Sequence, residues 1–248
     1  MHSLYAGVVN EVHKLISRRG TIIFLAIIAI FPIISGLIFS QLQSQSGIVA
    51  VDTNGFPLIL LGIATSFILP LFIFMAAADS FAGETGAKTL KLTLIRPISR
   101  FKVFMAKVIT LGLYISLMLT VIWVTSLISG LFWAQGFSYQ GLYQGVMAYT
   151  VSWLPLMVLA LMAAALAQGF KTGSGALTLT LVLYLLMKLV PFLYPNGAPL
   201  FPGFYTDWYL HWLESSSYDR LYQGLVYLLS GSTLFFTLGY YAFSQKEI

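Results

Sequence analysis

The chain has 248 residues, of which 58% are hydrophobic and only 8% are charged. Soluble domains carry about 25% charged residues, so this composition excludes a water-soluble protein and indicates one membrane domain over residues 1–248. The net charge of +5 is explained by basic residues beside membrane spans, so nucleic acid is not an expected partner, and the lack of cysteine excludes disulfides and thiolate metal sites.

Residues 1–20 are predicted to form an amphipathic helix at the membrane surface. Apolar residues recur there at helical spacing, and the polar residues Glu11 and Lys14 lie largely off the apolar stripe. The stripe consists of Leu4, Val8, Val12 and Leu15. Such a helix is suited to the bilayer interface, so we expect the stripe to contact lipid; an ordinary cytoplasmic tail helix is the alternative.

Six apolar runs follow, each long enough to cross a bilayer as a helix, which needs about 20 residues. The first is not a signal peptide, because its apolar core is too long and no small-residue cleavage site follows it. The sequence therefore predicts an all-α membrane protein with six transmembrane helices. The runs are Thr21–Gln41, Pro57–Ala78, Val103–Trp133, Tyr143–Gln168, Ser174–Tyr194 and Leu221–Phe243.

The distribution of lysine and arginine predicts that both termini are cytoplasmic. Eleven of these residues lie before the first span, between spans two and three or at the foot of span three, between spans four and five, or after span six. The opposite loops carry only Arg220. Basic residues concentrate on the cytoplasmic side of membrane proteins, and an even number of spans places both termini on the same side.

The loop between spans two and three, residues 79–102, contains "FAGETGAKTLKL", which looks like a phosphate-binding loop but does not have its spacing. That motif needs a glycine directly before its lysine, within an α/β sheet, whereas Ala87 precedes Lys88 and the stretch follows a membrane span. We therefore expect no cofactor on this chain. A short helix ending before Pro97 is favoured, and its leucines must meet the bilayer or another protein.

The loop between spans five and six, residues 195–220, is predicted to be extracytoplasmic and is rich in aromatic residues. Aromatic side chains favour the headgroup level, so Trp208 and Trp212 are expected at the membrane interface, on a short interfacial or re-entrant helix. Lys188, inside span five, has two interpretations. Its long side chain could reach the outer interface, or it could lie in a substrate path.

The stretch "DSFAGETGAKTLKLTLIRPISRFKVFMAK", Asp79 to Lys107, resembles the signature of ABC-2-type transporter permeases. The topology matches over the whole chain, and the specific motif covers about thirty residues. Lys88 stands where the family usually has glycine, which concerns the local turn. The matching positions are Glu84, Thr89, Leu90, Pro97, Ile98, Ser99, Arg100 and Lys107.

The resemblance implies a half-transporter that pairs with a second, identical or related permease subunit. A cytoplasmic ABC ATPase subunit, which carries the ATP and Mg²⁺, would dock on a coupling helix over Glu84–Ile95. The family further implies export across a bacterial cytoplasmic membrane, and the apolar spans suit a hydrophobic or amphipathic substrate such as a peptide, an antibiotic or a lipid. The expected ATPase-coupling residues are Glu84, Thr89, Leu90, Leu94, Pro97 and Arg100.

The sequence also bears on three other classes of membrane protein. An intramembrane metalloenzyme is excluded because His2, His13 and His211 lie in terminal or loop regions on opposite sides, which leaves no metal ligands in a span. An ion-coupled secondary transporter would need more buried ionisable groups than Lys188 alone. A non-transporting scaffold, such as an immunity or sensor protein, shares the same hydropathy and stays open as an alternative.

Overall fold

The computed structural model describes residues 2–46, 55–86, 99–133, 139–213 and 218–246. Every regular element in these ranges is helical, and six stretches are long and apolar enough to cross a membrane. This confirms the predicted all-α fold and the six predicted spans. The stretches are Arg19–Gln41, Gly55–Gly86, Arg100–Phe132, Tyr139–Ala167, Gly173–Leu193 and Tyr218–Ser244.

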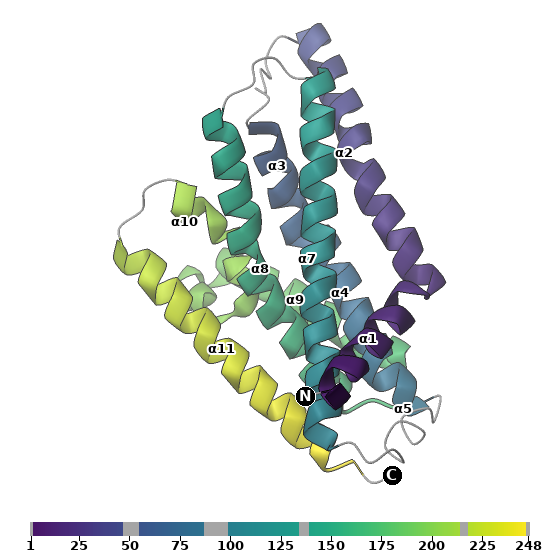
Figure 1. The fold of residues 1–248 in the computed structure, drawn as a ribbon. Coiled ribbons are helices and arrows are strands. Elements are labelled where there is room, and N and C mark those ends of the chain that lie inside the picture. Colours follow the sequence, from purple (N-terminus) through teal and green to yellow (C-terminus); the bar gives the residue numbers. More distant parts are fainter. Residues whose placement is uncertain (1, 47–54, 87–98, 134–138, 214–217, 247–248) are drawn as a thin grey trace.

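Two long helices, α7 (Arg100–Trp133) and α8 (Tyr139–Ala167), run beside each other through the middle of the bundle. As Figure 1 shows, α2 (Arg19–Ser46) lies along one side of them and α11 (Tyr218–Ser244) along the other. The short α1 (His2–Ile16) crosses the lower end of α7. The start of α1 and the end of α11 both lie at the lower end of the bundle in Figure 1, as an even number of spans requires.

The second span is one continuous helical stretch interrupted by two wider, π-helical turns. Pro70 has no N–H to donate to the carbonyl of Ser66, four residues earlier in the chain. The Tyr184 hydroxyl, from α9 (Gly173–Leu193), donates to that carbonyl at 2.7 Å. A neighbouring helix thus satisfies the backbone group that the proline leaves free. The elements are α3 (Gly55–Ile63), η1 (Ala64–Ile68), α4 (Leu69–Ala78), η2 (Asp79–Gly83) and α5 (Glu84–Gly86).

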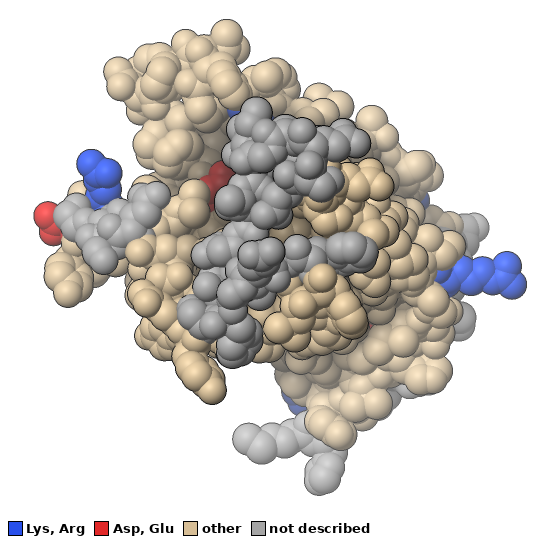
Figure 2. Space-filling model, turned by 90° about the horizontal axis from the view of Figure 1, so that it is seen from above, with Lys and Arg blue, Asp and Glu red and all other residues tan. Residues whose placement is uncertain are grey.

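The outer surface formed by the described residues is too apolar to face water. Large side chains such as Leu131, Phe192 and Leu193 are 61%, 84% and 84% exposed. Viewed from the upper end, Figure 2 shows isolated charged side chains on an otherwise uncharged surface, apart from the residues drawn in grey. Exposed apolar area of this extent marks a membrane or protein contact surface, which agrees with a bundle of membrane-spanning helices.

The segment between spans five and six folds into short helices that lie back against the bundle. These are the 3₁₀ helices η3 (Pro195–Leu200) and η4 (Pro202–Asp207), followed by α10 (Tyr209–Leu213). The predicted short helix is therefore formed, while the membrane depth that it reaches stays a prediction. Trp208 is only 3% exposed and contacts Val158 of α8 and Leu228 of α11, so its ring lies inside the protein.

Replacing Gly224 by alanine should destabilise the protein. The new Cβ would lie 2.3 Å from Nε1 of Trp208, and the buried indole has little room to move. Overpacking of this kind costs about 1–3 kcal/mol, which exceeds the gain of about 1 kcal/mol in helix propensity. The midpoint of thermal unfolding in detergent measures the effect.

The control for this substitution is Gly231→Ala on the same helix. There the Cβ would meet only ordinary van der Waals contact, 3.5 Å from Val158. Helix propensity alone then acts, so the thermal midpoint should stay equal or rise. Equal destabilisation by both substitutions would show that the position of the Trp208 ring does not matter.

Candidate functional site

Six ionisable side chains gather at the lower end of the bundle, where α1, the end of the second span and the start of α7 meet. We call this group the ionic cluster. Its three acidic and three basic side chains balance in formal charge, and they come from segments far apart in the sequence. The members are Glu11, Lys14, Arg18, Asp79, Glu84 and Lys107.

Lys107 is the centre of the ionic cluster. Its Nζ donates to Oε2 of Glu11 at 2.9 Å and to Oε2 of Glu84 at 2.8 Å. The lysine side chain is 0% exposed, and the carboxyl groups are 9% and 3% exposed. Ions this deeply buried are tolerated only when they are paired and hydrogen-bonded. The lysine therefore holds α1 and the end of the second span against α7.

Glu84 is shared by three cations. Besides Lys107, the Lys14 ammonium donates to its Oε1, and a guanidinium nitrogen of Arg18 lies 3.9 Å away. Another nitrogen of Arg18 lies 3.6 Å from Oδ2 of Asp79. Arg18, in the turn between α1 and α2, thus reaches both acids at the end of the second span.

The π-helical turn η2 explains how one arginine reaches two acids five residues apart. On an α-helix, side chains three or four residues apart are neighbours. In a π-helix the hydrogen bonds run from residue i to residue i+5, so residues five apart lie one turn from each other. The π turn over Asp79–Gly83 therefore places Asp79 and Glu84 on the same side of the helix.

Aromatic rings pack at the Lys107 end of the ionic cluster. The Lys107 ammonium lies 5.8 Å from the ring centre of Phe81. Phe81 and Phe243 lie 5.7 Å and 5.6 Å from Phe104 between ring centres. All three rings are at most 2% exposed. Coulomb attraction is stronger in such an apolar environment than in water, so the ion pairs of Lys107 are a rigid junction.

The start of α7 also holds the C-terminal end of α11. The Arg100 guanidinium donates to the carbonyl oxygens of Ser244 and Lys246, the latter at 3.1 Å. Nζ of Lys246 in turn donates to Oγ1 of Thr85 at 3.1 Å, and burial lowers the pKa of this ammonium. Residues 84–86 are therefore linked both to the ionic cluster and to the end of the chain.

The predicted coupling residues occupy two different places. Glu84 lies buried inside the ionic cluster, and Arg100 lies at the first residue of α7. The other four, Thr89, Leu90, Leu94 and Pro97, lie outside the described residues. Glu11 and Asp79 were not predicted as site residues. Lys107 was counted among the basic residues that predict the orientation and matches the family motif, but no site role was predicted for it.

Helix α1 buries part of its predicted apolar stripe against the bundle. Leu15 is 5% exposed, and the rest of the predicted stripe, Leu4, Val8 and Val12, is half-buried. The most exposed apolar side chain of the helix is Tyr5, at 72%. The hydrogen bond from Lys107 to Glu11 holds that side of the helix toward α7. Contact of this helix with the bilayer stays a prediction.

Lys188 turns toward the short helices that follow its own span. Its Nζ donates to Oγ1 of Thr206 at 2.6 Å, and Thr206 is 0% exposed. Asp207 lies close enough to attract the ammonium. Burial raises the pKa of Asp207, although Lys188 and Ser66 act in the opposite direction. The lysine thus connects span five to η4.

Replacing Lys188 by methionine should loosen residues 195–213. The change removes the donor to Thr206 and the charge facing Asp207, and a hydrogen bond to a charged group contributes about 1.5–3 kcal/mol. The expected results are a lower thermal midpoint and faster proteolysis within 195–213. The exposed Lys171 provides the control: if Lys171→Met has the same effect, the bond to Thr206 contributes nothing.

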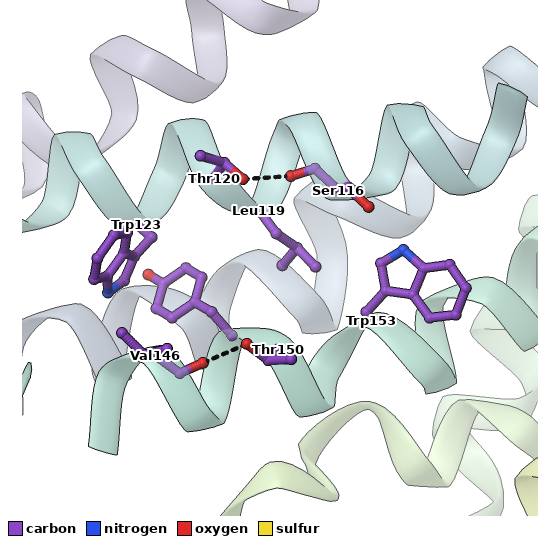
Figure 3. A pocket seen from close by; sticks show the side chains of 8 residues that line it. Ser116, Leu119, Thr120, Trp123, Val146, Thr150 and Trp153 are labelled. Atoms are coloured by element: carbon purple, nitrogen blue, oxygen red, sulfur yellow. Dashed lines mark hydrogen bonds between the residues drawn. The ribbon is translucent and has the colours of Figure 1, made fainter. Parts of the chain in front are cut away.

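A groove opens between the middle parts of α7 and α8 (Figure 3). Its volume is about 440 Å³, and none of the described residues that line it is charged. Aromatic rings and hydroxyl groups make up most of its walls. The lining residues are Ser116, Leu119, Thr120, Trp123, Val146, Tyr149, Thr150 and Trp153.

Comparison with known proteins gives two kinds of match. A family model described as "ABC-2 family transporter protein" matches residues 8–187. The chain is 24% identical over 232 residues to an uncharacterized membrane protein, YdbK of Bacillus subtilis (strain 168), covering 91% of this chain and 90% of that protein. It is 41% identical over 61 residues to the uncharacterized protein YhcI of the same organism, covering 25% of this chain and 20% of YhcI.

Proposed function

Because the chain belongs to the ABC-2 transporter family, we propose that it is the permease subunit of an ABC exporter, driven by ATP that a separate cytoplasmic subunit hydrolyses. The observation that carries this proposal is the ionic cluster. It connects the beginning of the loop between spans two and three to α1 and α7 through ions that have almost no contact with solvent. A force applied to that loop would therefore move several helices together.

The coupling residues divide into two roles under this proposal. Thr89, Leu90, Leu94 and Pro97 form the surface that meets the ATPase. Glu84 and Arg100 anchor the two ends of the same segment, since Glu84 binds Lys107 and Arg100 binds the carbonyl groups at the end of α11. The anchors convert motion of the segment into motion of the spans, because buried and paired ions resist separation.

The cargo is proposed to be hydrophobic or amphipathic, such as a peptide, an antibiotic or a lipid-like molecule, and it leaves the cell across a bacterial cytoplasmic membrane. The groove between α7 and α8 supports this choice because its lining, within the part of the chain that the structure describes, carries no charge. A second permease subunit, identical or related, completes the path, and both termini face the cytoplasm. A scaffold, immunity or sensor protein is the alternative.

Purification of the tagged chain from its native membranes in mild detergent tests the proposal. Mass spectrometry should find a soluble ATPase with a complete phosphate loop, in stoichiometric amount, and should show whether the second permease is another copy or a relative. The purified assembly should hydrolyse ATP. If the chain is recovered without an ATPase and without ATPase activity, the permease function is rejected and the scaffold alternative is favoured.

A further inference from the structure

The groove between α7 and α8 has the size and lining of a small-molecule site. Its volume of about 440 Å³ lies within the range of roughly 300–1,000 Å³ that is typical of ligand pockets. Trp123 and Trp153 stand at opposite ends, and Leu119 lies between them (Figure 3). Aromatic and aliphatic walls with a few polar groups are the usual composition of such pockets.

Almost every hydrogen-bond donor in the groove is already used by the protein. The hydroxyls of Ser116, Thr120 and Thr150 each donate to a carbonyl four residues earlier on their own helix, at 3.0, 2.8 and 2.7 Å. Tyr149 donates to the Pro57 carbonyl at 3.0 Å, and Trp153 to the Gly112 carbonyl at 3.1 Å. The hydroxyl oxygens keep free lone pairs, so they can still accept hydrogen bonds from a ligand.

Trp123 is the exception. Among the residues that the structure describes, its buried Nε1–H has no acceptor. The nitrogen faces Gly145 of α8, where a Cβ would lie 3.3 Å away, so no side chain separates the two helices at this point. A buried donor without a partner costs about 1–3 kcal/mol. The nitrogen itself is buried against α8, so a ligand acceptor would recover that free energy only after the indole ring turned toward the groove.

We propose that this groove binds the apolar portion of the transported molecule. The ligand is uncharged there, has an aromatic or branched apolar body, and carries at least one hydrogen-bond acceptor and one donor. This inference rests on the proposed transport function and specifies the substrate class. An ionic cargo does not fit, because a charge in the groove would have no counter-ion and would lose its hydration.

Two other occupants fit the groove less well. An acyl chain of a bilayer lipid would use neither the three hydroxyl oxygens nor the indole N–H. A helix of a second subunit packs best against small residues that allow close backbone approach, whereas here bulky indole rings form the two ends of a hollow (Figure 3). The groove therefore favours a compact molecule with some polarity.

Photolabelling in lipid nanodiscs tests the inference. The probe is an uncharged phenyl diazirine that carries a carboxamide, the competitor is benzanilide, which has one N–H donor and one carbonyl acceptor, and mass spectrometry locates the labelled residues. Labelling of Ser116, Thr120, Val146 and Thr150 should saturate and should fall when competitor is added. Labelling of Leu186 and Leu189, which are exposed on α9, should increase linearly with probe and ignore the competitor.

A matched pair of substitutions on α7 shows whether the groove itself is responsible. Thr120→Trp fills the groove and should abolish the displaceable labelling. Leu117→Trp adds the same ring at a position that is 39% exposed and does not line the groove, and it should leave the displaceable labelling intact. Thermal midpoints of the two variants establish that both are folded.

The possible outcomes separate this inference from the transport function. Labelling that cannot be displaced, or that survives in Thr120→Trp, means that lipid occupies the groove and overturns the inference. Absence of label from the groove residues means that another subunit covers them, which also overturns it. If the ATPase is nevertheless recovered with the chain, the proposed transport function is retained and only the binding site in the groove is rejected. Displaceable labelling without any ATPase supports a binding site and rejects the transporter.

Discussion

Replacing Lys107 by methionine is expected to lower the free energy of unfolding by about 3–5 kcal/mol, the usual cost of removing one partner of a buried ion pair. The lysine side chain is 0% exposed and binds the carboxylates of Glu11 and Glu84. Without it, two buried negative charges lie close together at the lower end of the bundle. Unfolding in mixed detergent micelles, followed by tryptophan fluorescence, measures the loss.

Two further variants distinguish this mechanism from a simple packing defect. Lys14→Met removes another partner of Glu84, but the Lys14 side chain is 37% exposed. The free energy of unfolding should therefore fall by only about 0–1 kcal/mol, the usual contribution of a surface ion pair. The triple variant Lys107→Met, Glu11→Gln, Glu84→Gln removes the stranded charges and should regain most of the stability. Equal losses in Lys107→Met and Lys14→Met would contradict the central place of Lys107.

The spans could be predicted from the sequence because their signal is local. Each is a run of apolar residues, and the observed limits differ from the predicted ones by a few residues, except at the end of the second span. There the helix continues from Ala78 to Gly86. Residues Asp79–Gly86 are more polar than the run before them, so hydropathy ended the span early. The extension depends on Arg18 and Lys107, which neutralise Asp79 and Glu84.

The ionic cluster could not be predicted from the sequence because its pairs are distant along the chain. Glu11 and Lys107 are 96 residues apart, and nothing near Glu11 indicates that it is buried. One signal was present. Lys107 is the fifth residue of the third predicted span, and a charge inside a span needs a counter-ion. Only the folded bundle identifies that counter-ion as two carboxylates from other helices.

Helix periodicity predicted α1 and its apolar stripe, but not which side of the helix faces α7. That side contains Gly7 and Glu11, while contact of Leu4 and Val8 with lipid stays a prediction. A Cβ at Gly7 would lie 3.4 Å from Cβ of Ala106, so the two helices approach closely where the side chains are small. Small residues and a paired charge therefore determine which side of α1 faces α7. Hydrophobic periodicity counts only apolar positions, so it takes neither into account.

Trp208 illustrates the same limit for aromatic residues. An indole is equally suited to the headgroup level and to a protein interior, so composition alone favoured the interface. The ring is buried because Gly224 on α11 leaves a space for it, with Nε1 only 2.3 Å from where a Cβ would lie. That space is visible only after α11 has been placed beside α10.

Replacing both Leu90 and Leu94 by aspartate is expected to uncouple ATP hydrolysis from the permease while the chain still inserts and folds. The two leucines belong to the segment proposed to dock on the ATPase, and an unpaired carboxylate buried in such an interface costs several kcal/mol. The basic residues that direct insertion are unchanged. ATPase activity of the assembly in nanodiscs should fall to that of the ATPase alone, and less ATPase should be recovered with the chain.

Two controls separate the loss of leucines from the gain of charge. Leu90→Ala with Leu94→Ala removes apolar surface without adding charge and should weaken coupling partially, whereas Thr93→Asp adds a charge to the same segment but keeps both leucines. The thermal midpoint of the double aspartate variant should equal that of the parent, because the ionic cluster stays intact. Lys107→Met, in contrast, should lower the stability strongly. If the double aspartate variant still stimulates the ATPase fully, this segment does not couple ATP hydrolysis to transport. The rigid junction around Lys107 would then have a role other than the transmission of force.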